Sequence, residues 1–328
     1  MNLIIGAGAV GTTLAALLAE HGQPVTLYAR AQDEARFSAA GGLWLARPGQ
    51  TPPGQRLALP PRTHQLDLQG VDAAYLCTKA AALPALLAEL PARLPDGCRL
   101  LCTLNGVRAL HQVKARFPGQ AVRPMSILFN AQLDAPLQAR LTTRARAVIG
   151  DAEPDLLARF AGSGLAVRAA EGETAVWGKL LINLANAIGA LTQSTFQDLF
   201  QDRVLRRLYA AVLDEATGVL AAAGIRFRLP VAFPYPAYRW SLTHGGPLPW
   251  WMARLANGLD RGAYPSMVAD VRAGRVTEVA ELNGEIVRQA EACGREAPLN
   301  RGLVDRVGAL RHPPARLSPA ALARELGV

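Results

Sequence analysis

A glycine-rich turn near the start of the chain, within MNLIIGAGAVGTTLAALLAEHGQPVTLYAR, constrains the fold more than any other feature. An apolar strand is expected at residues 3–5, followed by the pattern G-x-G-x-x-G and an apolar helix to about Glu20. A second strand is expected at residues 25–28. This order of strand, turn, helix and strand is the context in which the pattern binds a dinucleotide. A glycine-rich turn without a ligand is the less favoured interpretation.

The glycines of this turn have separate physical roles. Gly6 permits the tight turn, Gly8 lets a pyrophosphate approach the backbone, and Gly11 lets helix and strand pack closely. The first N–H groups of the helix and the positive end of its dipole then favour the phosphates. We therefore expect the cofactor contacts of this turn to be Gly6, Gly8, Ala9, Val10 and Gly11.

The residue after the second strand indicates which dinucleotide is bound. An NAD site usually has an Asp or Glu there, which accepts a hydrogen bond from the ribose 2′-hydroxyl, whereas this chain has Arg30. A guanidinium suits a 2′-phosphate in charge and in geometry. We expect NADP(H) as the cofactor; the alternative is an arginine that stacks on the adenine or faces solvent.

Strand-like runs alternate with helical segments over the rest of the first half. The strands are expected at 73–79, 99–106, 122–129, 146–150 and 165–170, and helices at 80–93 and 107–115. This alternation predicts a doubly wound sheet. Lys79 and Asn105 each come as a strand ends, and in such a sheet the carboxyl ends of the strands border the ligand crevice. The alternative for both is an ordinary loop residue.

After about residue 171 the pattern becomes helical, with apolar residues at helical spacing in 173–191, 203–224 and 278–292. The chain is therefore expected to be α/β, with an NADP-binding Rossmann-like domain at residues 1–170 and an all-helical substrate domain at residues 171–328. The segment 226–264 is rich in proline and holds three of the five tryptophans. We interpret it as an irregular cover over the core with short helices; the alternatives are a pocket wall or a subunit contact.

Three polar residues lie on one stripe of the apolar helix KLLINLANAIGAL. At the helical angle per residue, Lys179, Asn183 and Asn186 fall within roughly 60° of one another. A solvent-facing edge would explain such a stripe in an isolated helix. The alternative is that the stripe faces a ligand.

The stretch PSMVADVRAGRVTE at residues 265–278 is a second group of polar residues. Ser266 and Asp270 are four residues apart and share a helix face. Thr277 is a candidate N-cap for the next helix, so Glu278 is expected in its first turn, where the macrodipole favours the ionised carboxylate. Taken alone, Glu278 is an ordinary first-turn acid.

Composition narrows the range of partners. The net charge is +9, which favours an anionic small ligand as readily as a polymer, but the 32 arginines and three lysines form no basic block, and we expect no nucleic acid. The four cysteines and five histidines lack metal-ligand spacing, and no metal is expected. No apolar run reaches 18 uncharged residues and no signal peptide is evident, so we expect no membrane and a cytoplasmic protein. A homodimer is compatible with the sequence, which does not determine the oligomeric state.

The motifs taken together resemble the 2-dehydropantoate 2-reductase (ketopantoate reductase) family over nearly the whole chain. The resemblance rests on GAGAVG, LYAR, CTKA at 77–80, LNG at 104–106, WGKLLIN at 177–183, PSMVADVRAGRVTE and ELNGEIV. Two of the three lysines, Lys79 and Lys179, fall on family motif positions.

The resemblance implies an enzyme that transfers hydride from NADPH to the ketone of a 2-keto acid, most simply ketopantoate to pantoate in pantothenate biosynthesis. It implies Lys179 as the general acid and Glu278 as the residue that bonds the substrate hydroxyl and orients the lysine. It also implies that Arg30 binds the 2′-phosphate and that Lys79 and Asn105 lie near the nicotinamide and the substrate. The substrate contacts that it implies are Asn105, Asn183, Asn186 and Ser266.

The departures from the family concern substrate recognition. Ala187 and Ala263 stand where relatives commonly have asparagines, and Asn130 lies in ILFNAQL where relatives have alanine and histidine. A pocket that lacks partners for a substrate hydroxyl discriminates against that substrate. The alternatives are therefore a reductase of another keto acid or an opine-type substrate, or a non-catalytic NADP-binding regulator.

Overall fold

The structure is a computed structural model that describes residues 1–259, 262–312, 314 and 316–328. The chain forms two compact units. The first comprises Met1–Leu104 and Arg108–Ala175, and the second comprises Asn105–Val107 and Val176–Val328. The domain limits expected at residues 170 and 171 stay a prediction.

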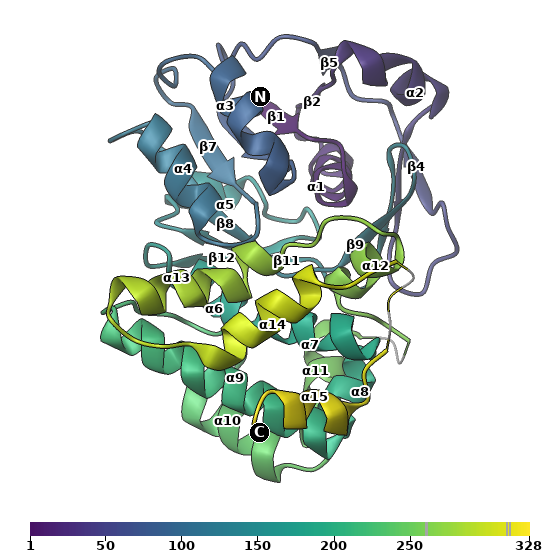
Figure 1. The fold of residues 1–328 in the computed structure, drawn as a ribbon. Coiled ribbons are helices and arrows are strands. Elements are labelled where there is room, and N and C mark those ends of the chain that lie inside the picture. Colours follow the sequence, from purple (N-terminus) through teal and green to yellow (C-terminus); the bar gives the residue numbers. More distant parts are fainter. Residues whose placement is uncertain (260–261, 313, 315) are drawn as a thin grey trace. The chain divides into compact units, whose positions relative to one another are not determined.

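The first unit is built on an eight-stranded sheet in the order β12-β11-β8-β7-β6-β1-β2-β5 (Figure 1). Its strands are β1 (Asn2–Ile5), β2 (Val25–Tyr28), β5 (Arg62–Thr63), β6 (Ala73–Leu76), β7 (Arg99–Cys102), β8 (Val122–Ile127), β11 (Arg146–Gly150) and β12 (Ala166–Ala170). Strands from β5 to β8 in this order run parallel, while β11 is antiparallel to β8. From β1 the chain passes to β2 on one side and later to β6 on the other, which confirms the doubly wound fold.

Helices and a second sheet complete the first unit. The helices are α1 (Ala9–Glu20), η1 (Ala31–Asp33), α2 (Glu34–Ala39), η2 (Ala80–Ala82), α3 (Leu83–Glu89), α4 (Arg108–Arg116) and α5 (Pro154–Ala158). The second sheet, which the sequence did not predict, has the order β4 (Gln55–Leu57), β3 (Leu43–Ala46), β10 (Gln138–Leu141) and β9 (Ala131–Ala135). The helix expected over 80–93 is wrong at its end: Leu90 is extended, as a residue before proline prefers to be.

The second unit contains helices and no strand within the part of the chain that the structure describes. They are α6 (Thr174–Asn183), which begins in the first unit, α7 (Ala185–Thr192), α8 (Phe196–Gln201), α9 (Arg203–Ala222), α10 (Tyr235–His244), α11 (Leu248–Asn257), α12 (Ser266–Arg272), η3 (Val279–Glu281), α13 (Asn283–Ala292), α14 (Pro298–Gly308) and α15 (Pro319–Glu325). The all-helical character expected after residue 171 is thus confirmed.

Two local expectations in the second unit need correction. The helix predicted over 278–292 is split into η3 and α13, because Leu282 leaves the helical region of backbone conformation. Thr277 is not an N-cap; Glu278 occupies the capping position of η3 and makes no side-chain capping bond.

The stretch Thr174–Thr192 is long and apolar enough to cross a membrane, but 72% of it is buried in the structure, as in the core helix of a globular protein.

Within the segment 226–264, of which the structure describes 226–259 and 262–264, α10 and α11 form and the three tryptophans differ in burial. Trp250 is 1% exposed, whereas Trp240 and Trp251 are 57% and 47% exposed. The expectation of a packed cover therefore holds for Trp250 and not for its two tryptophan neighbours.

Candidate active site

The glycine turn after β1 has the packing that its spacing predicts. Gly6 has a φ of +107°, and a Cβ there would lie 2.8 Å from the carbonyl carbon of Cys77. A Cβ at Gly11 would lie 1.9 Å from the oxygen of Gly6, so helix and strand touch through backbone alone. By contrast, a Cβ at Gly8 would meet nothing within 4 Å. The space beside Gly8, at the start of α1, is what a pyrophosphate contact needs; the contact itself stays a prediction.

Arg30 and Lys79 follow the carboxyl ends of β2 and β6, on either side of β1. The chain adds β2 on one side of β1 and β6 on the other, so the strand order reverses between β1 and β6. Ligands of such sheets bind at the point of reversal. Both side chains are exposed. The guanidinium of Arg30 forms no hydrogen bond or ion pair with any described residue. A cation near the end of the sheet that has no partner among the described residues is suited to bind an anion.

Lys179 is positioned by its neighbours on α6. Trp177 is buried, with 4% of its surface exposed. A Cβ at Gly178 would lie 1.8 Å from the oxygen of Arg228, so the absence of a side chain lets the backbone around Arg228 pack directly against the helix. Tyr209 donates a hydrogen bond to the carbonyl of Ile182 at 3.2 Å, one turn further on. These contacts fix the helix, while Lys179 itself remains half-buried.

A chain of hydrogen bonds joins Lys179, Asn105 and Glu278 within the second unit. Lys179 Nζ donates to Asn105 Oδ1 at 2.6 Å, and Asn105 Nδ2 donates to Glu278 Oε2 at 2.8 Å. Because an ammonium can only donate and a carboxylate can only accept, the amide of Asn105 has a single orientation that satisfies both. The other two N–H groups of Lys179 have no partner among the described residues and are available for a ligand.

Burial and charge act in opposite directions on Lys179. Burial lowers the pKa of Lys179, the nearby Glu278 carboxylate raises it, and the result is a pKa of about 8. An ammonium with a pKa near neutrality both stays protonated and gives up its proton readily, as a general acid must.

The bridging position of Asn105 was not evident from the sequence. The sequence places it at the end of a strand of the first domain, whereas the segment Asn105–Val107 packs with the second unit. The signal that was present is the glycine after it, which often marks a turn. The two groups that Asn105 joins, 74 and 173 residues away, could not be found from that signal.

The predicted substrate residues differ in exposure. Asn183 on α6 is half-buried, and Asn186 on α7 is 6% exposed, yet neither side chain hydrogen-bonds to a described residue. Ser266, the first residue of α12, is exposed. Ala187 is fully buried and Ala263 half-buried. Of the residues implied for the substrate, the structure joins only Asn105 directly to Lys179 and Glu278.

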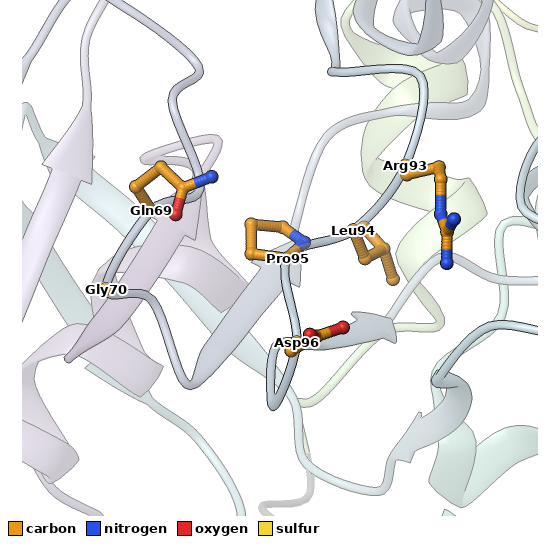
Figure 2. A pocket seen from close by; sticks show the side chains of 6 residues that line it. All are labelled: Gln69, Gly70, Arg93, Leu94, Pro95 and Asp96. Atoms are coloured by element: carbon orange, nitrogen blue, oxygen red, sulfur yellow. The ribbon is translucent and has the colours of Figure 1, made fainter.

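The first unit has a cavity that none of the predicted site residues lines. A hollow of about 520 Å³ lies at the turns before β6 and β7, the amino ends of those strands, and is lined by Gln69, Gly70, Arg93, Leu94, Pro95 and Asp96 (Figure 2). Among the described residues, no group of three His, Cys, Asp or Glu side chains could hold a metal ion.

Known proteins resemble this chain over nearly its full length. Residues 2–154 match the family described as ketopantoate reductase PanE/ApbA, and residues 172–311 match its C-terminal counterpart. A 2-dehydropantoate 2-reductase of Mycobacterium tuberculosis is 30% identical over 321 residues, which cover 95% of this chain and 98% of that protein.

Solved structures show the same architecture. The PanE/ApbA family ketopantoate reductase of Ralstonia eutropha is 26% identical, with a TM-score of 0.76 over 94% of this chain and 97% of its own. D-mandelate dehydrogenase, solved with NADH and anilino(oxo)acetate, has the same TM-score at 20% identity. The match covers 100% of this chain and 100% of that chain. The second likeness concerns the fold alone.

Proposed function

Because the chain belongs to the ketopantoate reductase family of oxidoreductases, we propose that it uses NADPH to reduce 2-dehydropantoate to pantoate, a step of pantothenate biosynthesis. The observation that carries the proposal is the hydrogen-bonded chain of Lys179, Asn105 and Glu278, which holds an ammonium with two N–H groups available. A protein that only binds the cofactor has no use for such a proton donor, which argues against a regulator.

The residues of the first unit fit a dinucleotide. The open side of Gly8 and the first N–H groups of α1, at Ala9 and Val10, would hold the pyrophosphate. Arg30 would bind the 2′-phosphate with its guanidinium, which has no partner in the described part of the chain, and Lys79 would lie beside the bound cofactor. When bound, the nicotinamide would supply the hydride for reduction of the keto carbon.

The residues of the second unit manage the proton. As the carbonyl carbon gains a hydride, its oxygen gains negative charge and takes a proton from the Lys179 ammonium, leaving a neutral amine. Asn105 keeps the ammonium in place through its carbonyl oxygen, and Glu278 in turn holds the amide and stabilises the cation. Solvent returns the proton to the lysine after the alcohol leaves.

Asn183, Asn186 and Ser266 are the proposed partners of the substrate's polar groups. A buried amide without a hydrogen bond is unfavourable, so Asn186 gains most from a polar ligand. Asn183 follows Lys179 by one helical turn and shares its face. The cytoplasmic location and a homodimer stay predictions.

The rate of keto-acid reduction is expected to fall above about pH 8. Lys179 carries its proton below its pKa of about 8 and loses it above, so kcat/KM for the keto acid is level at lower pH and declines as pH rises through this value. In the variant Lys179→Arg the guanidinium stays protonated over this pH range. Its kcat/KM, although lower than that of the wild type, should therefore not decline as pH rises. The measurement is kcat/KM from pH 6 to 10 at saturating NADPH. A decline that persists in the arginine variant would assign the titration to another group.

The proposed substrate is tested by following NADPH oxidation with ketopantoate beside a panel of other 2-keto acids, phenylglyoxylate among them. Turnover of ketopantoate above that of the others supports the proposal. Preference for another keto acid would show that Ala187 and Ala263 belong to a changed pocket. Binding of NADPH without turnover of any compound would favour the regulator instead.

A further inference from the structure

Gly106, next to Asn105, occupies a position that no other residue can take without displacement. Its φ is +78°, a left-handed conformation that L side chains rarely adopt. A Cβ at this position would lie 2.7 Å from the carbonyl oxygen of Glu281, a backbone atom that a side-chain rotation cannot move. Backbone conformation and space therefore both require glycine here.

The backbone that leaves no room for a Cβ at Gly106 belongs to the same turn that Asn105 contacts. The N–H of Glu281 donates to the carbonyl oxygen of Glu278 at 3.0 Å, which closes the turn around η3. A Cβ at Gly106 would meet the end of this turn, and Asn105 donates to the Glu278 side chain at its start. Two consecutive residues of one segment are thus matched to one turn, 173 residues away along the chain.

We propose that Gly106 is a positioning residue for the proton donor: its bare backbone lets the segment Asn105–Val107 lie against the turn at Glu281, which brings the amide of Asn105 between Lys179 and Glu278. Gly106 acts through Asn105 and touches no substrate itself. The inference rests on the proposed role of Lys179 as the proton donor and adds Gly106 as a residue that positions this donor.

A methyl group at position 106 has a specific consequence. To relieve the contact with the Glu281 oxygen, the segment must move by a few tenths of an ångström or more, and Asn105 moves with it. The Lys179 ammonium then loses an acceptor at 2.6 Å. Loss of a hydrogen bond to the charged form lowers a lysine pKa, so donor geometry and pKa change together.

The test compares Gly106→Ala with Gly97→Ala. Gly97 has the same φ of +78°, but a Cβ there would meet nothing within 4 Å, so its variant has the backbone strain without the contact. We expect Gly106→Ala to lower kcat about 10- to 100-fold with the Kd of NADPH unchanged. Its alkaline decline should move to lower pH by about one unit. Gly97→Ala should keep the wild-type kcat and pH profile.

A second readout does not require turnover. With three lysines in the chain, the pH dependence of amine acetylation, resolved by peptide mass spectrometry, reports Lys179 separately, and Lys79 and Lys114 serve as internal references. The pH at which acetylation of Lys179 is half-maximal should be lower in Gly106→Ala than in the wild type and should be unchanged in Gly97→Ala. If the wild type turns over no keto acid, the proposed function fails while this readout still tests Gly106.

A double-mutant comparison separates positioning from general destabilisation. In an Asn105→Ala background, Gly106→Ala should change kcat by less than about twofold, because its route of action is already removed. Should Gly106→Ala not fold, Gly106→Asn tolerates a positive φ and carries the same Cβ, and the same two readouts apply. Equal behaviour of the Gly106 and Gly97 variants, or full additivity with Asn105→Ala, would overturn the proposal.

Discussion

Lys179→Ala is expected to lower kcat for keto-acid reduction about 10³-fold while NADPH binding is retained. A positioned general acid contributes about 10²- to 10⁴-fold, and alanine removes both the proton and the N–H groups that are available to the keto oxygen. Asn105 and Glu278 would remain, but neither an amide nor a carboxylate can replace an ammonium as the acid. The measurement is kcat at saturating ketopantoate, together with the Kd of NADPH by titration.

Lys114→Ala is the matched control for this substitution. Lys114 pairs with Glu173 at 2.7 Å at a half-exposed position of α4, so its removal costs about 1 kcal/mol of stability or less and should not alter kcat. A loss of less than tenfold in Lys179→Ala would remove the lysine from the role of acid. A loss of NADPH binding instead would place Lys179 in the cofactor site.

Arg30→Asp is expected to lower kcat/KM with NADPH about 10²-fold and to leave kcat/KM with NADH nearly unchanged. A hydrogen bond to a charged group contributes about 1.5–3 kcal/mol, and the new carboxylate would repel the 2′-phosphate as well. In NADH the same carboxylate could accept a hydrogen bond from the ribose 2′-hydroxyl, as in NAD-dependent proteins. The measurement is the ratio of the two kcat/KM values for the variant and the wild type.

Arg36→Asp controls for the change in overall charge. Arg36 lies six residues further on, on α2, where it is exposed and pairs with Asp33 at 3.4 Å. Both variants change the net charge by the same amount, so a long-range effect on an anionic cofactor would appear in both. A specific 2′-phosphate contact predicts that only Arg30→Asp changes the ratio, and equal weakening of NADPH and NADH would contradict the assignment.

Most elements of the first unit could be predicted because their signals are local. The strand at residues 25–28, the helix that ends at Glu20 and the glycine turn between β1 and α1 all follow from hydrophobic period and backbone freedom. The packing at Gly6 and Gly11 confirms what their spacing predicts. The small sheet of β3, β4, β9 and β10 was missed because its short, partly exposed strands pair across about 90 residues of chain.

The candidate site divides between sequence and tertiary structure in the same way. The resemblance of the motifs to the family was sufficient to single out Lys179, Glu278 and Asn105, although Glu278 taken alone is an ordinary first-turn acid. Their connection was not predictable, because a helix, a turn and a loop from three distant parts of the chain must meet within hydrogen-bond distance. The sequence by itself determined the fold class, the cofactor motif and the chemical groups. Only the tertiary structure decided that Asn105 holds the lysine, since the contacts that place it, from Gly106 to Glu281 and from Asn105 to Glu278, are long-range.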